Sequence, residues 1–268
     1  MQNATLGRAQ IDDDALFDPL RYAMASRDAD IMSMVRDALD DGRAQLAFQP
    51  VVTADAQHNI AFHEGLMRLT DETGRVIPAG HFMPSIEEST LGRQIDCVTL
   101  YLALRHLRQN EEMRLSVNLS ARSIGDGEWR RILDRGLMDH VGLGERLIFE
   151  ISESSAMMLH ENVMRFMWEM QPKGVGFALD GFGAGLTAFR YLKDFYFDLV
   201  KIDKSFVKGI DHDPDNQVLV EALIAVAHQF EMFVVADGVE TEAEASFLKG
   251  IGADCLQGYF FGVPGFEL

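Results

Sequence analysis

Seven polar side chains stand at or near the ends of short apolar segments that are spread along the chain. They are Glu64, Asn118, Glu150, Asp180, Lys201, Asp237 and Gln257. The set offers carboxylate and amide oxygens and contains no His or Cys. Such oxygens are the ligands that Mg²⁺ and Mn²⁺ prefer, whereas Zn²⁺ favours nitrogen and sulfur. If these segments are strands that end on one face, the residues predict a site for Mg²⁺ or Mn²⁺.

Each of these residues also has a simpler explanation. A single acid at the end of a strand is most often a helix N-cap or a solvated turn residue. Glu150 in "LIFEIS" and Lys201 in "LVKID" differ, because a charge within an apolar strand is costly unless it is paired or bound to a metal. A structural ion pair between Glu150 and Lys201 is therefore the alternative to a role in catalysis.

Eight apolar or β-branched segments are candidates for the strands that position these residues. They are "LAFQPVV" (46–52), "AFHEGLMRL" (61–69), "RLSVNLS" (114–120), "LIFEIS" (147–152), "GVGFALD" (174–180), "DLVKID" (198–203), "MFVVAD" (232–237) and "CLQGYFF" (255–261). Strands this apolar need helices on their outer face, so the pattern favours an α/β fold of the TIM, or (β/α)₈, barrel type. A doubly wound open sheet is the competing fold.

Helical spacing of apolar residues separates most of these strands. It predicts helices over residues 28–41, 96–109, 161–170, 184–195, 216–230 and 242–252. Residues 1–27 are polar and rich in acids, and we expect a tail there, carrying at most one short helix. No Pro-rich or Ser-rich linker divides residues 28–268, which predicts a single domain.

Composition restricts the partners of the chain. Its 268 residues carry 42 acidic and 24 basic side chains, a formal net charge of -18, which argues against binding to nucleic acid polymers or anionic membranes. Cys97 and Cys255 form no metal-binding or disulfide pattern. The sequence shows no leader and no apolar segment long enough to span a bilayer, so we expect a cytoplasmic protein.

Two further features have weak functional meaning. "GFGAG" (181–185) lacks the third glycine of the dinucleotide-binding pattern, which argues against NAD. His63 directly precedes Glu64, so on a strand it points to the opposite face and is interpreted as a packing or surface residue.

A series of phrases in one order resembles the EAL-domain cyclic di-GMP phosphodiesterases. The phrases are "EGLMR", "SVNLS", "FEISES", "ALDGFGAG", "LVKIDKSFV", "VVADGVET" and "LQGYFFGVP", and the resemblance runs from about residue 28 to the C-terminus. It implies a modified TIM barrel with an antiparallel first strand, which binds cyclic di-GMP at the C-terminal mouth. It also implies hydrolysis of that ligand to pGpG with Mg²⁺ or Mn²⁺.

The resemblance assigns roles to individual residues. It implies that the first metal is held by Glu64, Asn118, Glu150 and Asp180, that Asp180 bridges to a second metal, and that Asp237 belongs to the second site. It implies that Gln49, Leu66, Arg68 and Gln257, together with Glu64 and Asn118, contact cyclic di-GMP. Lys201 would hold the attacking water or the developing negative charge, and Glu153 would brace the loop after Asp180. Lys201, Asp237 and Glu153 form the catalytic group.

Three positions depart from the family pattern. Gly181 stands where active members have a second aspartate, Asp237 stands where they have glutamate, and Leu186 lies in a loop that the family uses for dimerisation and for positioning the second metal. We therefore expect a cyclic di-GMP receptor or regulatory module with weak or absent hydrolysis. The alternatives are an active phosphodiesterase and an interaction module that binds no nucleotide. Family analogy also suggests a homodimer and a regulatory protein partner.

Overall fold

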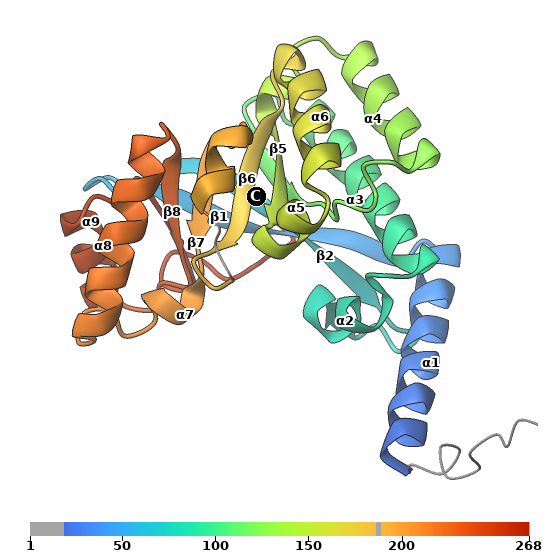
Figure 1. The fold of residues 1–268 in the computed structure, drawn as a ribbon. Coiled ribbons are helices and arrows are strands. Elements are labelled where there is room, and N and C mark those ends of the chain that lie inside the picture. The colour runs from blue at the N-terminus through green and yellow to red at the C-terminus, as the bar shows by residue number, and fades with distance from the viewer. Residues whose placement is uncertain (1–18, 186–188, 268) are drawn as a thin grey trace, which may run out of the picture.

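Eight strands close into a barrel in the computed structural model, which describes residues 19–185 and 189–267 (Figure 1). They are β1 (Ala44–Thr53), β2 (Ile60–Thr70), β4 (Leu115–Asn118), β5 (Leu147–Ser152), β6 (Gly176–Phe182), β7 (Leu199–Ile202), β8 (Phe233–Asp237) and β9 (Cys255–Gln257). The order around the ring is β1-β9-β8-β7-β6-β5-β4-β2, and β2 pairs again with β1. A short strand, β3 (Val76–Pro78), pairs only with β2 and lies outside the ring.

The first strand runs against its neighbours. β1 is antiparallel to both β2 and β9, and every other neighbouring pair in the ring is parallel. Only six residues separate β1 from β2, which is enough for a hairpin but too few for the crossover that a parallel pair requires. The barrel and its antiparallel first strand confirm the predicted fold, and the open-sheet alternative is wrong.

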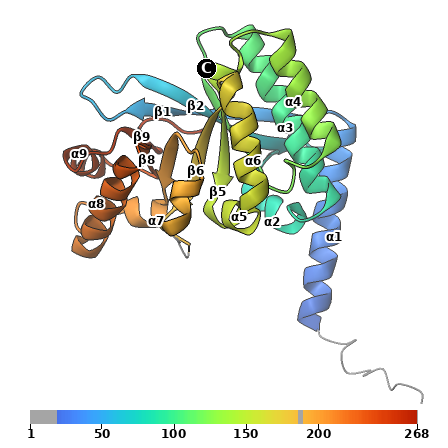
Figure 2. The same cartoon turned by 45° about the horizontal axis from the view of Figure 1, so that its top comes forward.

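Most helices pack around the outside of the barrel, whereas much of α1 projects away from it (Figures 1 and 2). The helices are α1 (Pro19–Asp40), α2 (Met83–Ile86), α3 (Thr90–Gln109), α4 (Gly127–Asp139), α5 (Glu153–Met158), α6 (His160–Met170), α7 (Lys204–Val207), α8 (Pro214–Gln229) and α9 (Glu242–Gly250). Short 3₁₀ turns are η2 (Ala79–His81), η3 (Gly144–Arg146), η4 (Gln171–Lys173) and η5 (Phe189–Asp194). Within the described ranges, no helix has the length and apolar character needed to cross a bilayer.

The eight predicted strands are present, whereas the helices differ from the prediction in several places, and α2, α5, α7 and β3 were not predicted. α1 begins at Pro19, within the segment expected to be a tail, so the helix predicted over residues 28–41 is longer than expected. Within the helix predicted over 184–195, the structure has a shorter 3₁₀ helix, η5, over Phe189–Asp194. α4 was not predicted, although Trp129 and Leu133 anchor its inner face in the core. The boundary between a tail and a domain stays a prediction.

The main core lies between the barrel and the helices. Phe149 on β5 and Phe177 on β6 point outward and contact Phe166 of α6, and Trp129 of α4 contacts Phe149 and Phe166. These aromatic side chains are almost fully buried. Burying them outside the barrel fixes the alternation of each strand, so the intervening residues must point inward.

Candidate functional site

Two layers of side chains fill the inside of the barrel. An apolar layer is built from Val51, Phe62, Ala178, Leu199 and Val235, with Ile148 and Cys255 packed against it. Side chains on one face of a strand recur every second residue, so the next layer toward the mouth is formed by the residues two positions away from the apolar layer. In this chain those residues are polar. These are Gln49, Glu64, Glu150, Asp180, Lys201, Asp237 and Gln257. In β1 the polar residue Gln49 stands two positions before the apolar-layer residue Val51. In the other strands the polar residue stands two positions after the apolar-layer residue, because β1 runs in the opposite direction.

Lys201 lies at the centre of the polar layer. Its Nζ is 2.7 Å from Glu64 Oε2 and 2.8 Å from Glu150 Oε2, and all three side chains are buried. Asn118 donates its amide N–H to Glu64 Oε1 at 2.9 Å, and Gln257 donates to Glu64 Oε2 at 2.6 Å. The ion pair between Glu150 and Lys201 that the sequence suggested is thus present in the structure. Lys201 also pairs with Glu64, which the sequence interpretation did not include.

Burial and charge act in opposite directions on this cluster. Burial alone would lower the pKa of Lys201, but the carboxylates of Glu150 and Glu64 outweigh it and hold that pKa well above its ordinary value. Burial would raise the pKa of Glu64, but Lys201 and the donors around it hold that pKa below its ordinary value. Burial raises the pKa of Glu150 to about 8, and the neighbouring charge of Glu64 adds to this effect. Lys201 thus favours the charged form of Glu64, whereas burial and the charge of Glu64 favour the protonated form of Glu150.

Asp180 and Asp237 are the two other acidic residues of the polar layer, besides Glu64 and Glu150. Each lies near the C-terminal end of its strand, on β6 and β8, and burial raises the pKa of each carboxyl group while Lys201 lowers it. Glu64 raises both pKa values further because its charge has the same sign. One lysine thus faces four carboxyl groups, so this part of the barrel holds an excess of negative charge.

The structure brings the other predicted residues to the same mouth, with different surroundings. Gln49 accepts from Gln257 at 3.3 Å and donates to the carbonyl of Gly262 at 3.1 Å. Leu66 and Arg68 follow Glu64 on the same face of β2, and Arg68 donates to its neighbour's carbonyl at 2.9 Å. Burial lowers the pKa of Arg68, although its guanidinium remains only half-buried.

The loop after Asp180 contacts Glu153. The Glu153 side chain is buried and its Oε2 accepts from the Gly183 N–H at 3.3 Å, which is the kind of contact that a bracing role requires. Gly181 has φ +73°, and a Cβ placed there would meet no described atom within 4 Å. Leu186, whose departure from the family pattern was noted, lies outside the described residues.

The donor set fits a hard divalent cation in its chemistry. Glu150 Oε1 is buried and has no hydrogen-bond partner among residues 19–185 and 189–267, which is costly for a carboxylate oxygen unless another group binds it. The excess of carboxylates over Lys201 favours a cation for the same reason. In the described part of the chain, however, no group of three or more His, Cys, Asp or Glu is arranged to hold a metal. Lys201 lies between Glu64 and Glu150 instead.

Two hollows open beside this cluster. One, of about 280 Å³, is bordered by Leu66, Asn118, Glu150 and Ser152 on the β2, β4 and β5 side, with Asp96 of α3 in its wall. The other, of about 250 Å³, is bordered by Gln49, Asp237 and Tyr259 on the β1 and β8 side. Sequence reasoning did not single out Asp96 or Tyr259. Tyr259 could have been found because it follows Gln257 in "LQGY", whereas Asp96 carries no such signal.

Comparison with known proteins identifies the fold family. The family model described as the EAL domain matches residues 32–264. A bifunctional diguanylate cyclase/cyclic di-GMP phosphodiesterase of Pseudomonas aeruginosa, MucR, is 30% identical over 92% of this chain and 37% of its own length. The Escherichia coli cyclic di-GMP phosphodiesterase PdeF is 28% identical over 87% of this chain and 32% of its own length. The chain thus spans about a third of these relatives.

Solved structures agree with that result. The phosphodiesterase PaMucR in complex with c-di-GMP superposes with a TM-score of 0.81 at 30% identity, covering 88% of this chain and 97% of that one. The FimX EAL domain from Pseudomonas aeruginosa bound to c-di-GMP gives a TM-score of 0.80 at 27% identity, with 89% and 97% covered. Because the family model spans most of the chain and the barrel matches in three dimensions, this chain belongs to the EAL domain family.

Proposed function

We propose that this chain is an EAL domain that binds cyclic di-GMP as a receptor or regulatory module and hydrolyses it weakly or not at all. The coarser part of this function follows from family membership, since the similar structures contain c-di-GMP. The finer part depends on one observation. The position after Asp180, at the mouth of the barrel, is Gly181, which supplies no carboxylate.

Binding is supported by the shape and chemistry of the mouth. The two hollows border different parts of its rim, and cyclic di-GMP consists of two identical halves. Arg68 offers a permanently charged, forked donor near the mouth, which suits a phosphate oxygen. Gln49 and Gln257 add amide groups on the side of β1 and β9.

The protein's own groups suit the holding of a phosphodiester better than its cleavage. Lys201 supplies a buried positive charge against which negative charge on an attacking oxygen would be stabilised. Glu64, Asn118, Glu150 and Asp180 would hold the first Mg²⁺ or Mn²⁺, and Asp180 and Asp237 remain for the second. Paired cations supply activation of water and stabilisation of the leaving oxygen. Gly181 removes one carboxylate from the second site, and Asp237 is shorter than glutamate by one methylene group.

A direct experiment separates binding from turnover. Cyclic di-GMP binding is measured by calorimetry in Ca²⁺, and release of pGpG is measured in Mg²⁺ and in Mn²⁺. We expect saturable binding with little or no pGpG. Turnover at the rate of ordinary phosphodiesterases would show that the active-enzyme alternative is right. Absence of both signals would leave the interaction module.

Restoring the missing carboxylate tests the cause of weak hydrolysis. We predict that Gly181→Asp combined with Asp237→Glu raises the rate of pGpG release by about tenfold or more, since a recruited second cation is worth several kcal/mol in the transition state. The side chain at 181 has open space among the described residues. Aspartate tolerates a positive φ better than most residues, so the fold should accept it.

The matched control for this change is Gly181→Asn with Asp237→Glu. Asparagine has the shape of aspartate and meets the same backbone strain at φ +73°, but it carries no charge. We expect no gain from the asparagine variant. Equal rates in the aspartate and asparagine variants would place the defect elsewhere than in the second cation site.

A further inference from the structure

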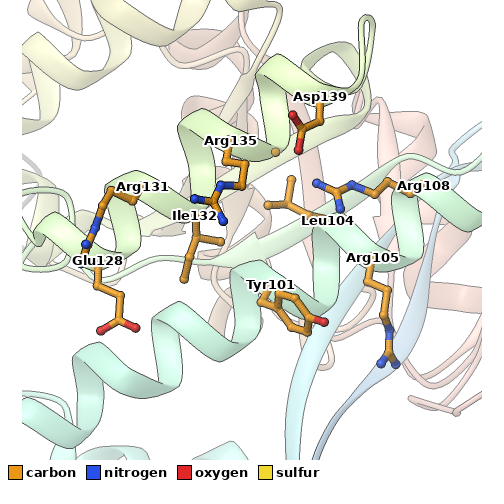
Figure 3. Close-up of a pocket in the computed structure, with 10 residues that line it drawn as sticks. Tyr101, Leu104, Arg105, Arg108, Glu128, Arg131, Ile132, Arg135 and Asp139 are labelled. Carbon is orange, nitrogen blue, oxygen red and sulfur yellow. The ribbon is translucent and has the colours of Figure 1, made fainter.

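A groove between α3 and α4 lies on the outer face of the barrel, away from the polar layer (Figure 3). Its volume is about 390 Å³, and four arginines line it: Arg105 and Arg108 from α3, and Arg131 and Arg135 from α4. Ile132 gives the groove apolar surface, Leu104 lines it but is almost fully buried, and Tyr101 contributes from α3. The mechanism proposed for the mouth uses none of these residues.

The four arginines of the groove make no ion pair with the chain itself. Among the arginines whose side chains the structure describes, only Arg43, Arg93, Arg122 and Arg130 have a carboxylate oxygen within 4.0 Å. Among the described residues, none of the four in the groove lies within 4.0 Å of a carboxylate oxygen. This holds even though Glu128 and Asp139 line the same groove. Apart from Arg131 Nε–H, which donates to the carbonyl of Gly127, these guanidinium groups are available to an outside anion.

Two of the four arginines point into the same region of the groove, whereas Arg105 points away from it (Figure 3). Arg108 and Arg135 extend toward each other over Leu104, from opposite walls, while Arg131 extends on the side of Glu128 (Figure 3). Arg131 is held in place by donation to the carbonyl of Gly127 at 3.0 Å. Forked guanidinium donors from two walls match the oxygens of adjacent phosphates, which accept several charge-assisted hydrogen bonds at once.

The remaining surface fits an aromatic group. The Tyr101 side chain is 56% exposed, which leaves ring surface available, and Leu104 and Ile132 lie beside it. A volume near 390 Å³ belongs to the range of small-ligand sites, and a partner protein would need a contact of about 800 Å² on each side instead. The concave shape and the inward direction of Arg108 and Arg135 therefore favour a small ligand over an acidic protein surface.

We propose that the groove between α3 and α4 is a second binding site, which takes a nucleoside di- or triphosphate. The phosphates lie between Arg108 and Arg135, and the base packs against Tyr101. The net charge of -18 repels anions from the molecule as a whole, so binding here depends on these local guanidinium groups. The site is independent of the function proposed for the barrel mouth.

Calorimetry on the whole chain in divalent-free buffer tests the site, with ADP, ATP, GTP, pyrophosphate and adenosine as probes. We expect saturable binding of the nucleotides, weaker binding of pyrophosphate and none of adenosine. Arg108→Ala with Arg135→Ala should weaken nucleotide binding by about tenfold or more. Arg165→Ala, which removes an exposed arginine of α6, should change it by less than about twofold.

A second variant separates the base from the phosphates. Tyr101→Ala should weaken nucleotide binding by about tenfold and leave pyrophosphate binding unchanged. Saturating cyclic di-GMP should not compete with the nucleotides for the groove. The affinity of the protein for cyclic di-GMP should be the same in the double arginine variant, in Arg165→Ala and in Tyr101→Ala. That second measurement also confirms that the variants are folded, and it distinguishes failure at the groove from failure at the mouth.

Several outcomes would overturn the proposal. They are an absence of saturable nucleotide binding, binding that survives the double arginine substitution, and pyrophosphate binding as tight as that of nucleotides. Displacement of nucleotide by a hexaglutamate peptide that binds more tightly would assign the groove to an acidic protein segment instead.

Discussion

At the scale of single residues, the site depends on how Lys201 balances the carboxylates around it. The lysine is buried with Glu64 and Glu150, and removing one partner of a buried ion pair leaves an uncompensated charge in the interior. Lys201 Nζ also lies between the carboxylates of Glu64 and Glu150, which are predicted ligands of the first metal. Stability and ligand chemistry are therefore coupled at this one position.

Replacing this lysine tests the balance. We predict that Lys201→Met lowers the free energy of unfolding by about 3 to 5 kcal/mol, because Glu64 and Glu150 lose their counter-charge. Added Mn²⁺ should recover part of the loss, since a cation replaces the ammonium. Thermal or urea unfolding measures both effects, and Lys249→Met, at an exposed position on α9, is the control. An unchanged stability of Lys201→Met would contradict the assigned ion pairs.

Asp96 is a second buried acid with a different role. It accepts from the Ser123 hydroxyl at 2.6 Å and the Ser120 N–H at 3.3 Å, and so connects α3 to the loop that follows Asn118. Burial raises its pKa to about 7, and the nearby charge of Glu87 adds to the increase. Because the folded pKa lies above the unfolded value, the folded state favours the protonated form.

The sign of this shift gives a pH prediction. Ionisation of Asp96 destabilises the fold. The contribution of Asp96 to the free energy of unfolding therefore declines as the pH rises from about 4 toward 7, and it stays low above that. We predict that Asp96→Asn is more stable than the parent at pH 8 and that its advantage shrinks at pH 5. Urea unfolding at both pH values measures the difference, and all other titrating groups cancel between the two proteins. A pH-independent difference would mean that the carboxyl group does not titrate in this range.

At the scale of elements, the first turn of α9 contacts the loop that follows β8, the strand that carries Asp237. Thr241 caps α9 and Glu244 forms a capping box with it. The Glu244 carboxylate also accepts from the Gly209 N–H at 2.7 Å and from the Glu240 N–H at 2.7 Å. One buried side chain therefore connects the loop after β8 to the start of the loop that follows α7.

Truncating that side chain should damage both loops. We predict that Glu244→Ala lowers the free energy of unfolding by about 2 to 3 kcal/mol, because backbone N–H groups lose a charged acceptor. The loss should exceed that of Thr241→Ala, about 1 kcal/mol for a cap alone. Glu242→Ala, on the exposed side of the same first turn, is the control. Equal losses for Glu244→Ala and Thr241→Ala would show that the bonds to residues 209 and 240 contribute little.

At the scale of the whole molecule, the net charge of -18 opposes the ligand proposed for the mouth. Cyclic di-GMP carries two negative charges, so long-range repulsion slows its approach, and salt screens that repulsion over distances near 10 Å at 0.1 M. We predict that the association rate rises by about twofold or more between 20 and 300 mM NaCl. Stopped-flow fluorescence measures it, with equiosmolar sucrose as the control. A rate that falls with salt would indicate that local cations such as Arg68 dominate the encounter.

Much of the fold and of the site could be predicted from sequence. The eight strands could be predicted because each is short and apolar. Glu64, Glu150 and Lys201 were singled out because they are polar residues at or near the ends of these strands. The family phrases added the direction of β1. Weaker signals were missed or only partly predicted: α4 was not predicted, and the helix predicted over 184–195 is a 3₁₀ helix limited to Phe189–Asp194 in its described part. Metal binding and the catalytic assignments stay predictions.

The sequence by itself determined which chemical groups this barrel presents, because strand alternation and the order of the segments are local properties of the chain. It also determined that Gly181 brings no carboxylate to the mouth. Only the tertiary structure decided which of these groups touch, since ring closure brings Glu64, Glu150 and Lys201 together from positions 51 and 137 residues apart along the chain. The arginine groove likewise exists only once α3 and α4 pack side by side, because no local pattern records which helix faces share a wall.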